Sequence, residues 1–110
     1  MTFDSDLMRA TVETVILQLL RERQMYGYEI IKVVNERTDG AFKWKEGTLY
    51  PCLHRMETAG TIISEWVDGD AGKARKYYRL TAKGQALAAD KASEWRAFSG
   101  AMDALMCQPA

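Results

Sequence analysis

Residues 46–80 decide the fold, and they read EGTLYPCLHRMETAGTIISEWVDGDAGKARKYYRL. Apolar residues recur every three or four positions over residues 48–59, which predicts a helix with one buried face. That face comprises Leu49, Leu53 and Met56. β-branched and aromatic residues then dominate residues 61–67 and 76–80, which predicts two strands. Residues 68–72 between them hold two glycines and suit a hairpin loop.

Proline and glycine mark the two ends of this predicted helix. Pro51 lacks an N–H, so it fits only the first turn, and the helix is expected to begin near Gly47 or Thr48. Gly60 is a stop signal, because glycine readily adopts the left-handed conformation that ends many helices.

Two further helices are expected before this stretch. Apolar periodicity predicts helices over residues 6–24 and 29–38. Ser5 or Asp6 is the expected cap of the first helix. The dipeptide at positions 39–40, Asp-Gly, is a stop signal for the second.

The chain continues on either side with a short extended piece and a last helix. Residues 42–44 are expected to be extended. Thr81 caps a helix that runs to about residue 106, although Gly84 stands where a capping box would have Glu or Gln. The predicted fold is mostly α with a small β-hairpin. It is a winged helix-turn-helix domain over residues 1–81, followed by a C-terminal dimerisation helix and short tail over residues 82–110.

The composition is that of an ordinary globular domain, with 47% hydrophobic and 27% charged residues. The sequence has no apolar run long enough for a membrane span and no signal-peptide pattern, so a cytoplasmic protein is expected. The net charge is zero, but residues 32–83 hold ten Lys/Arg against seven Asp/Glu. Any contact with phosphates is therefore expected to be local.

Three helices followed by a hairpin predict that the third helix enters a DNA major groove and the hairpin, or wing, follows the backbone. Thr48, Cys52 and Arg55 form a stripe beside the apolar face of that helix, which we expect to point outward. The residues expected to contact DNA are Thr48, Tyr50, Pro51, Arg55, Lys73, Arg75 and Lys76. The alternatives are a capping role for Thr48, a core position for Tyr50 and a solvated charge for Arg55.

Strand alternation divides the second strand into two faces. Tyr78 and Leu80 are expected to be buried, while Arg75, Tyr77 and Arg79 share the opposite face. The basic residues near the hairpin tip are interpreted as phosphate contacts. Their alternative role is to protect a strand edge from aggregation.

Apolar residues in the last helix follow a 3, 4, 3 spacing, typical of a coiled-coil contact. They are Trp95, Phe98, Met102 and Leu105. A symmetric homodimer would bury this surface. The alternative is packing against the first helix of the same chain.

Several motifs together resemble the PadR family of transcriptional regulators. They are Tyr26-Gly-Tyr-Glu-Ile30, Glu46-Gly-Thr-Leu-Tyr-Pro51, Leu53-His-Arg-Met-Glu57 and Arg75-Lys-Tyr-Tyr-Arg-Leu-Thr81 with Gly84. The resemblance implies a winged-helix homodimer that usually represses transcription and is released by a small effector. A single predicted helix after Thr81 is similar to the short branch that includes multidrug-responsive regulators.

The same resemblance suggests an effector site. Trp95, in Ser93-Glu94-Trp95, matches a tryptophan that in the multidrug-responsive branch stacks on flat aromatic compounds at the dimer centre. Paired indoles can sandwich a planar cation, and Met8 and Val12 are expected as pocket walls. The alternative is a tryptophan that fills the dimer core without a ligand.

The sequence therefore predicts a sequence-specific DNA-binding repressor released by a small aromatic or cationic effector between subunits. One alternative is a winged-helix module that binds another protein. The other is a thiol redox sensor using Cys52. No enzyme, cofactor or metal site is expected, because His54 is the only histidine and the two cysteines have no metal-ligand spacing.

Overall fold

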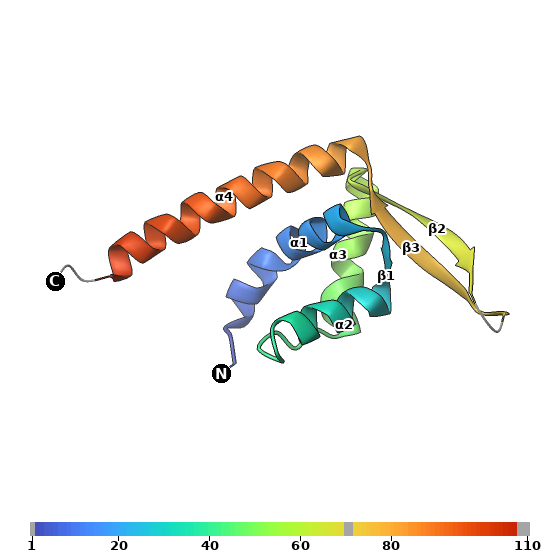
Figure 1. Ribbon diagram of the computed structural model, residues 1–110, viewed down its shortest axis with the longest axis horizontal. Coiled ribbons are helices and arrows are strands. Elements are labelled where there is room, and N and C mark those ends of the chain that lie inside the picture. The colour runs from blue at the N-terminus through green and yellow to red at the C-terminus, as the bar shows by residue number, and fades with distance from the viewer. Residues whose placement is uncertain (1, 70–71, 108–110) are drawn as a thin grey trace.

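The computed structural model describes residues 2–69 and 72–107. Its elements are α1 (Ser5–Glu22), β1 (Met25–Tyr26), α2 (Gly27–Arg37), α3 (Glu46–Ala59), β2 (Ile62–Asp68), β3 (Ala74–Leu80) and α4 (Ala82–Met106). In Figure 1 the first three helices form one group, the β2–β3 hairpin extends from one end of it, and α4 extends in the opposite direction. The predicted mostly α fold with a winged helix-turn-helix and a C-terminal helix is confirmed.

Three predicted helix starts differ from the structure. Asp4, not Ser5 or Asp6, caps α1, with its carboxylate accepting a hydrogen bond from the Asp6 amide at 2.9 Å. The start of α2 is Gly27, two residues earlier than expected. The start of α3 is Glu46, so Pro51 lies in its second turn, where a missing N–H costs one backbone hydrogen bond without preventing the helix.

A three-stranded antiparallel sheet in the order β1-β3-β2 replaces the predicted two-stranded hairpin. β1 is only two residues long and pairs through Met25↔Tyr78 and Tyr26↔Tyr77. The predicted hairpin itself is confirmed, with β2 and β3 paired from Ile62↔Leu80 to Asp68↔Ala74. Of the expected loop, residues 70 and 71 lie outside the described residues.

The extended piece predicted over residues 42–44 is not a strand. The side-chain amide of Asn35 holds the backbone of Trp44 instead, donating to its carbonyl at 3.2 Å and accepting from its N–H at 2.9 Å. One side-chain amide thus satisfies the backbone groups that a neighbouring strand would otherwise pair. This clamp positions the segment that leads into α3.

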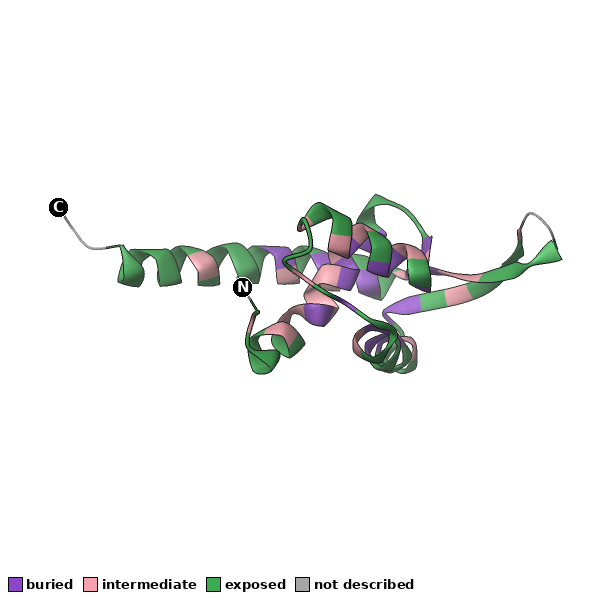
Figure 2. Cartoon of the chain, turned by 90° about the horizontal axis from the view of Figure 1, so that it is seen from below, coloured by how far each residue is buried: buried purple, intermediate pink, exposed green. Residues whose placement is uncertain are grey.

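The core lies where α1, α2 and α3 meet the base of the sheet. Figure 2 shows buried residues in these helices, at the base of the hairpin and in the first half of α4. The predicted burial of Leu49, Leu53, Met56, Tyr78 and Leu80 is confirmed. The expectation that Cys52 points outward is wrong, because the buried face of α3 is wide enough to include the position beside Leu49 and Leu53.

A close backbone contact fixes the start of α4. The Thr81 hydroxyl accepts from the Gly84 amide at 3.1 Å and donates to the Gly60 carbonyl at 2.7 Å. A Cβ at Gly84 would overlap the carbonyl oxygen of Thr61. This contact explains why glycine occupies the capping-box position.

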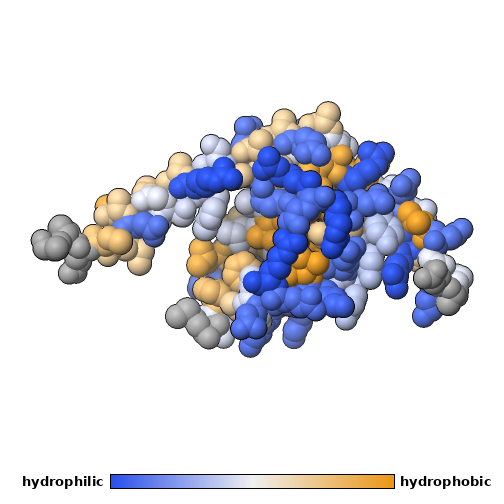
Figure 3. All heavy atoms as spheres, viewed as in Figure 1, coloured by the Kyte–Doolittle hydropathy of each residue, from blue (hydrophilic) through white to orange (hydrophobic). Residues whose placement is uncertain are grey.

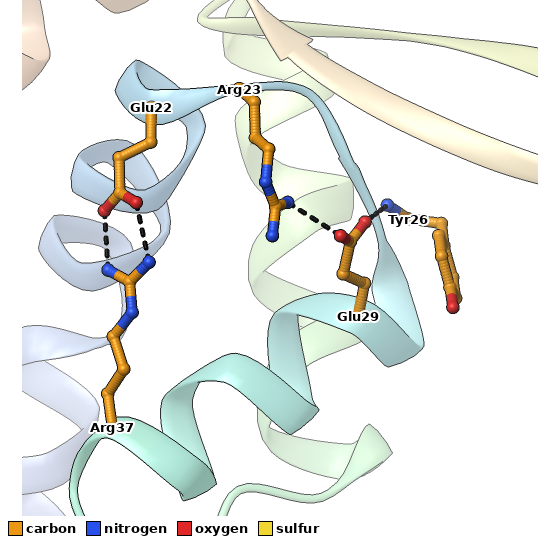
Figure 4. Close-up of polar contacts among 5 residues, drawn as sticks. All are labelled: Glu22, Arg23, Tyr26, Glu29 and Arg37. Atoms are coloured by element: carbon orange, nitrogen blue, oxygen red, sulfur yellow. Dashed lines mark hydrogen bonds and ion pairs between the residues drawn. The ribbon is translucent and has the colours of Figure 1, made fainter.

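Charged residues fasten the corner between α1 and α2, as Figure 4 shows. Arg37 donates two hydrogen bonds of 2.6 Å to Glu22, which lowers the pKa of that carboxyl. Arg23 lies 2.7 Å from Glu29, whose other carboxylate oxygen accepts from the Tyr26 amide at 3.4 Å. Exposed pairs of this kind stabilise weakly, but paired hydrogen bonds fix an orientation. They orient the N-terminus of α2.

α4 lies against α1 over its first half only. Ala88 and Ala92 are buried, and the Gln18 side chain donates to the Ala88 carbonyl at 2.8 Å. Beyond this contact α4 continues away from the rest of the chain (Figure 1). None of the described helices is long and apolar enough to cross a membrane.

The Gly84 contact generates a stability prediction. Gly84→Ala should lower the free energy of unfolding by about 2 kcal/mol, because the added methyl group meets a backbone atom that cannot move cheaply. The matched control is Gly100→Ala on the same helix, where a Cβ meets nothing within 4 Å. It should raise stability by about 0.5–1 kcal/mol. Urea denaturation measures both, and equal effects of the two substitutions would contradict the contact.

Candidate nucleic-acid interface

The outer face of α3 carries the residues expected to contact DNA. Tyr50, Pro51 and Arg55 are exposed and Thr48 is half-buried. The N-cap is Lys45, whose side chain makes no capping hydrogen bond, so Thr48 does not cap the helix. The predicted α3 residues thus lie on an accessible surface.

Tyr50 lies against the N-terminus of α2. Its ring and hydroxyl occupy the space that a Cβ at Gly27 would fill, so glycine is required there. Partial burial, with a smaller contribution from Glu46, raises the pKa of Tyr50. Its hydroxyl therefore keeps its proton at neutral pH and can donate it beside the positive end of a helix dipole. This pair of features suits an anionic group such as a phosphate.

The wing, defined as β2 and β3, carries two kinds of cation. The Arg75 guanidinium lies over the Tyr26 ring, 4.5 Å from its centroid, and forms no ion pair within the described part of the chain. Lys76 is engaged instead, since its ammonium lies 3.6 Å from Glu57. Lys73 is exposed near the hairpin tip. Arg75 is consequently the better placed of the two strand cations for an external anion.

Aromatic residues that the sequence analysis did not select complete this surface. A groove of about 290 Å³ between the wing, α2 and α3 is lined by Tyr26, Gly27, Tyr28, Tyr50, Trp66, Arg75, Lys76 and Tyr78. Trp66 is 70% exposed. Aromatic residues interleaved with the basic strand were a usable signal, but their convergence with α2 depends on β1, which was not predicted. We call this surface the wing groove.

A second depression lies on the other side of α3. It measures about 480 Å³ and is formed by the first turns of α1, the segment before α3 and the first turns of α3. Met8 and Val12 line it together with Thr48 and Arg55. Trp95 does not line it, so one chain alone does not bring together the three expected effector residues. We call this depression the α1–α3 hollow.

The four apolar residues predicted for a dimer contact, which we call the α4 seam, are exposed. Trp95 is 46% and Leu105 is 83% exposed, with Phe98 and Met102 between these values. The rings of Trp95 and Phe98 lie 6.3 Å apart. The alternative that this seam packs against α1 of the same chain is therefore wrong. Figure 3 shows apolar side chains along this distant part of α4.

Cys52 is poorly suited to redox sensing. It is only 3% exposed, within the core of apolar residues. Burial raises the pKa of its thiol, and the nearby Arg55 offsets only part of that rise. In the described residues no group of three or more His, Cys, Asp or Glu side chains could hold a metal ion.

Comparisons with known proteins agree with this geometry. The profile of the "Transcriptional regulator PadR-like family" matches residues 16–90. A transcriptional regulator of Mycobacterium tuberculosis is 33% identical over 81 residues, covering 74% of this chain and 72% of that protein.

Solved structures extend the likeness to nearly the whole chain. A transcriptional regulator from Clostridium thermocellum is 36% identical with a TM-score of 0.85, covering 96% of this chain and 100% of that one. A PadR family transcription regulator from Clostridium difficile is 37% identical with a TM-score of 0.78, covering 88% and 99%.

The burial of Cys52 generates a labelling prediction. With Ellman's reagent at pH 8, exposed Cys107 should react rapidly in the native protein, whereas Cys52 should react only when the chain unfolds. Its raised pKa leaves less thiolate at any given pH, and its position excludes the reagent. Absorbance at 412 nm follows the reaction, and Cys107→Ser should remove the rapid phase. A rapid phase that survives in Cys107→Ser would show that Cys52 is reactive.

Proposed function

The chain belongs to the PadR-like family of transcriptional regulators, and we propose that it represses transcription as a homodimer bound to a palindromic DNA site. Regulators of this family bind DNA and are not enzymes. The observation that carries the proposal is the position of Arg75 and Tyr50. They come from different elements and line one groove beside the exposed face of α3.

Each half of the proposed complex places α3 in the major groove. Helical geometry puts Tyr50 on one flank of the outer face of α3 and Thr48 and Arg55 on the other. The wing groove on the first flank supplies Arg75, the Tyr50 hydroxyl and the N-terminus of α2 to one phosphate backbone. Pro51 lies between the flanks, close to the base edges.

The zero net charge makes this local arrangement important. A neutral chain is not drawn to DNA by its overall charge, so binding depends on a few cations at the contact. Two copies double these contacts and read two half-sites. The same neutrality leaves a protein-binding module as the alternative function. The buried Cys52 gives no support to a redox sensor.

The dimer contact that we propose is the α4 seam. Trp95, Phe98, Met102 and Leu105 are exposed on a helix that extends past its own domain. Such an apolar surface is costly to leave in water, and a twofold axis lets the same seam cover itself. The paired Trp95 indoles would then form the walls of a site for a flat aromatic or cationic effector.

DNA binding should depend on Arg75. Arg75→Ala should weaken binding to a duplex from the promoter region by about ten-fold and lower the slope of log K against log salt by about 1, because one phosphate contact is lost. Fluorescence anisotropy between 50 and 200 mM NaCl measures both quantities. Lys32→Ala, an exposed lysine of α2 away from both flanks of α3, is the control and should change little.

The outcome of this titration is decisive for the main proposal. A folded dimer that binds no promoter DNA even at low salt would refute DNA-binding repression and favour a protein partner. An Arg75→Ala variant with an unchanged salt slope would refute the assigned phosphate contact.

Dimer formation should depend on the α4 seam. Phe98→Asp should convert the protein to a monomer at micromolar concentration, because a carboxylate would be buried in an apolar contact. Ala104→Asp, an exposed position on the opposite side of α4, should leave the dimer intact. Sedimentation velocity measures the species present. A dimer that survives Phe98→Asp would place the contact elsewhere.

A further inference from the structure

The α1–α3 hollow has the dimensions of a small-molecule site. Its volume of about 480 Å³ lies within the range of about 300–1,000 Å³ that ligand pockets occupy. It is formed in one chain, unlike the proposed effector site at Trp95, which requires two. The Asn35 clamp on the Trp44 backbone holds one wall of the hollow in place, so the site does not have to be assembled when a ligand arrives.

The inner surface of the hollow is apolar. Phe3, Met8, Val12, Trp44 and Pro51 all line it. Phe3 is braced by Phe42, whose ring meets it edge-on at 5.5 Å. A flat hydrocarbon body can bury its surface against these side chains, and burial of apolar area is favourable in proportion to the area removed from water.

The charged residues of the hollow are all cations. Arg9, Lys43 and Arg55 line it, and no carboxylate does. Arg9 is already paired with Asp6 at 2.9 Å. Lys43 and Arg55 form no ion pair within residues 2–69 and 72–107. Two cations are therefore available to a ligand.

Polar groups in the hollow also favour an anion. Gly47 and Thr48 from the first turn of α3 line it, where the helix dipole is positive. Trp44 is only 3% exposed, and its indole N–H finds no acceptor among the described residues. A buried donor without a partner is costly, and an acceptor atom of a ligand seated against Trp44 could satisfy it.

We propose that the α1–α3 hollow binds a small organic anion with a flat apolar body and a single carboxylate or sulfonate group. The apolar body packs against Met8, Val12 and Trp44, and the anionic group pairs with Lys43 and Arg55. The inference rests on the proposed DNA-binding function in one respect. Arg55 and Thr48 cannot serve a bound anion and DNA together, so the ligand weakens DNA binding by direct competition.

The direct test uses 2-naphthoate as the probe and the full-length protein without DNA. The three tryptophans give three indole N–H signals in a ¹H–¹⁵N spectrum, which Trp66→Phe and Trp95→Phe assign. Saturable movement of the Trp44 signal is expected. The neutral analogue 2-naphthalenemethanol should bind about ten-fold more weakly, because it lacks the charge that Lys43 and Arg55 recognise.

A matched pair of lysines controls for general electrostatics. Lys43→Gln should weaken naphthoate binding by about five- to ten-fold. Lys45→Gln removes the same charge two positions away, outside the hollow, and should change the dissociation constant by less than about two-fold. Both spectra also report whether the variant is folded. Equal effects of the two variants, equal binding of the neutral analogue, or movement of the Trp95 signal alone would overturn the site.

Competition is measured separately by adding naphthoate to the protein–DNA complex. Release of DNA by naphthoate but not by the neutral analogue supports direct competition. Naphthoate that binds beside Trp44 yet leaves DNA binding unchanged would overturn the competition and leave both the site and the DNA-binding proposal standing. Protein that binds naphthoate but never binds DNA would overturn the proposed function and not the site.

Discussion

The close backbone contact between Thr61 and Gly84 is the constraint on which the arrangement of the molecule depends. It brings together the end of α3, the start of the wing and the start of α4. Around it, the Thr81 amide donates to the Thr61 carbonyl at 3.1 Å and Lys83 donates to the Ala59 carbonyl at 2.7 Å. The direction of α4 relative to α3 is therefore set by backbone contacts, not by flexible side chains.

Local patterns were sufficient to predict most of the fold. The alternation between helical and extended spacing over residues 46–80 identified α3, the hairpin and their buried residues. Gly60 and Thr81 marked element ends, because capping depends on neighbours within a few positions. β1 escaped prediction because its two residues pair with a strand some fifty positions away and leave no periodic signal. Cys52 was misplaced because a stripe of three apolar residues understated the width of the buried face.

The candidate site was less predictable, since its residues acquire their roles from contacts between elements. Tyr50 is held by Gly27, and Arg75 lies over Tyr26, although nothing in either segment alone indicates the other. Lys76 appeared equivalent to Arg75 in the sequence, but Glu57 engages it. Sequence reasoning therefore chose the correct surfaces more readily than it ranked the residues within them.

The free half of α4 has a consequence for how operator spacing can change. α4 has 25 residues and is thus about 37 Å long. In the proposed homodimer, the point at which two α4 helices cross sets the distance between the two copies of α3. A shift of that crossing by one helical turn moves each contact by about 5.4 Å along the helix, more than the 3.4 Å rise of one base pair. Substitutions in the α4 seam can therefore retune the separation of half-sites while every residue that meets DNA stays the same.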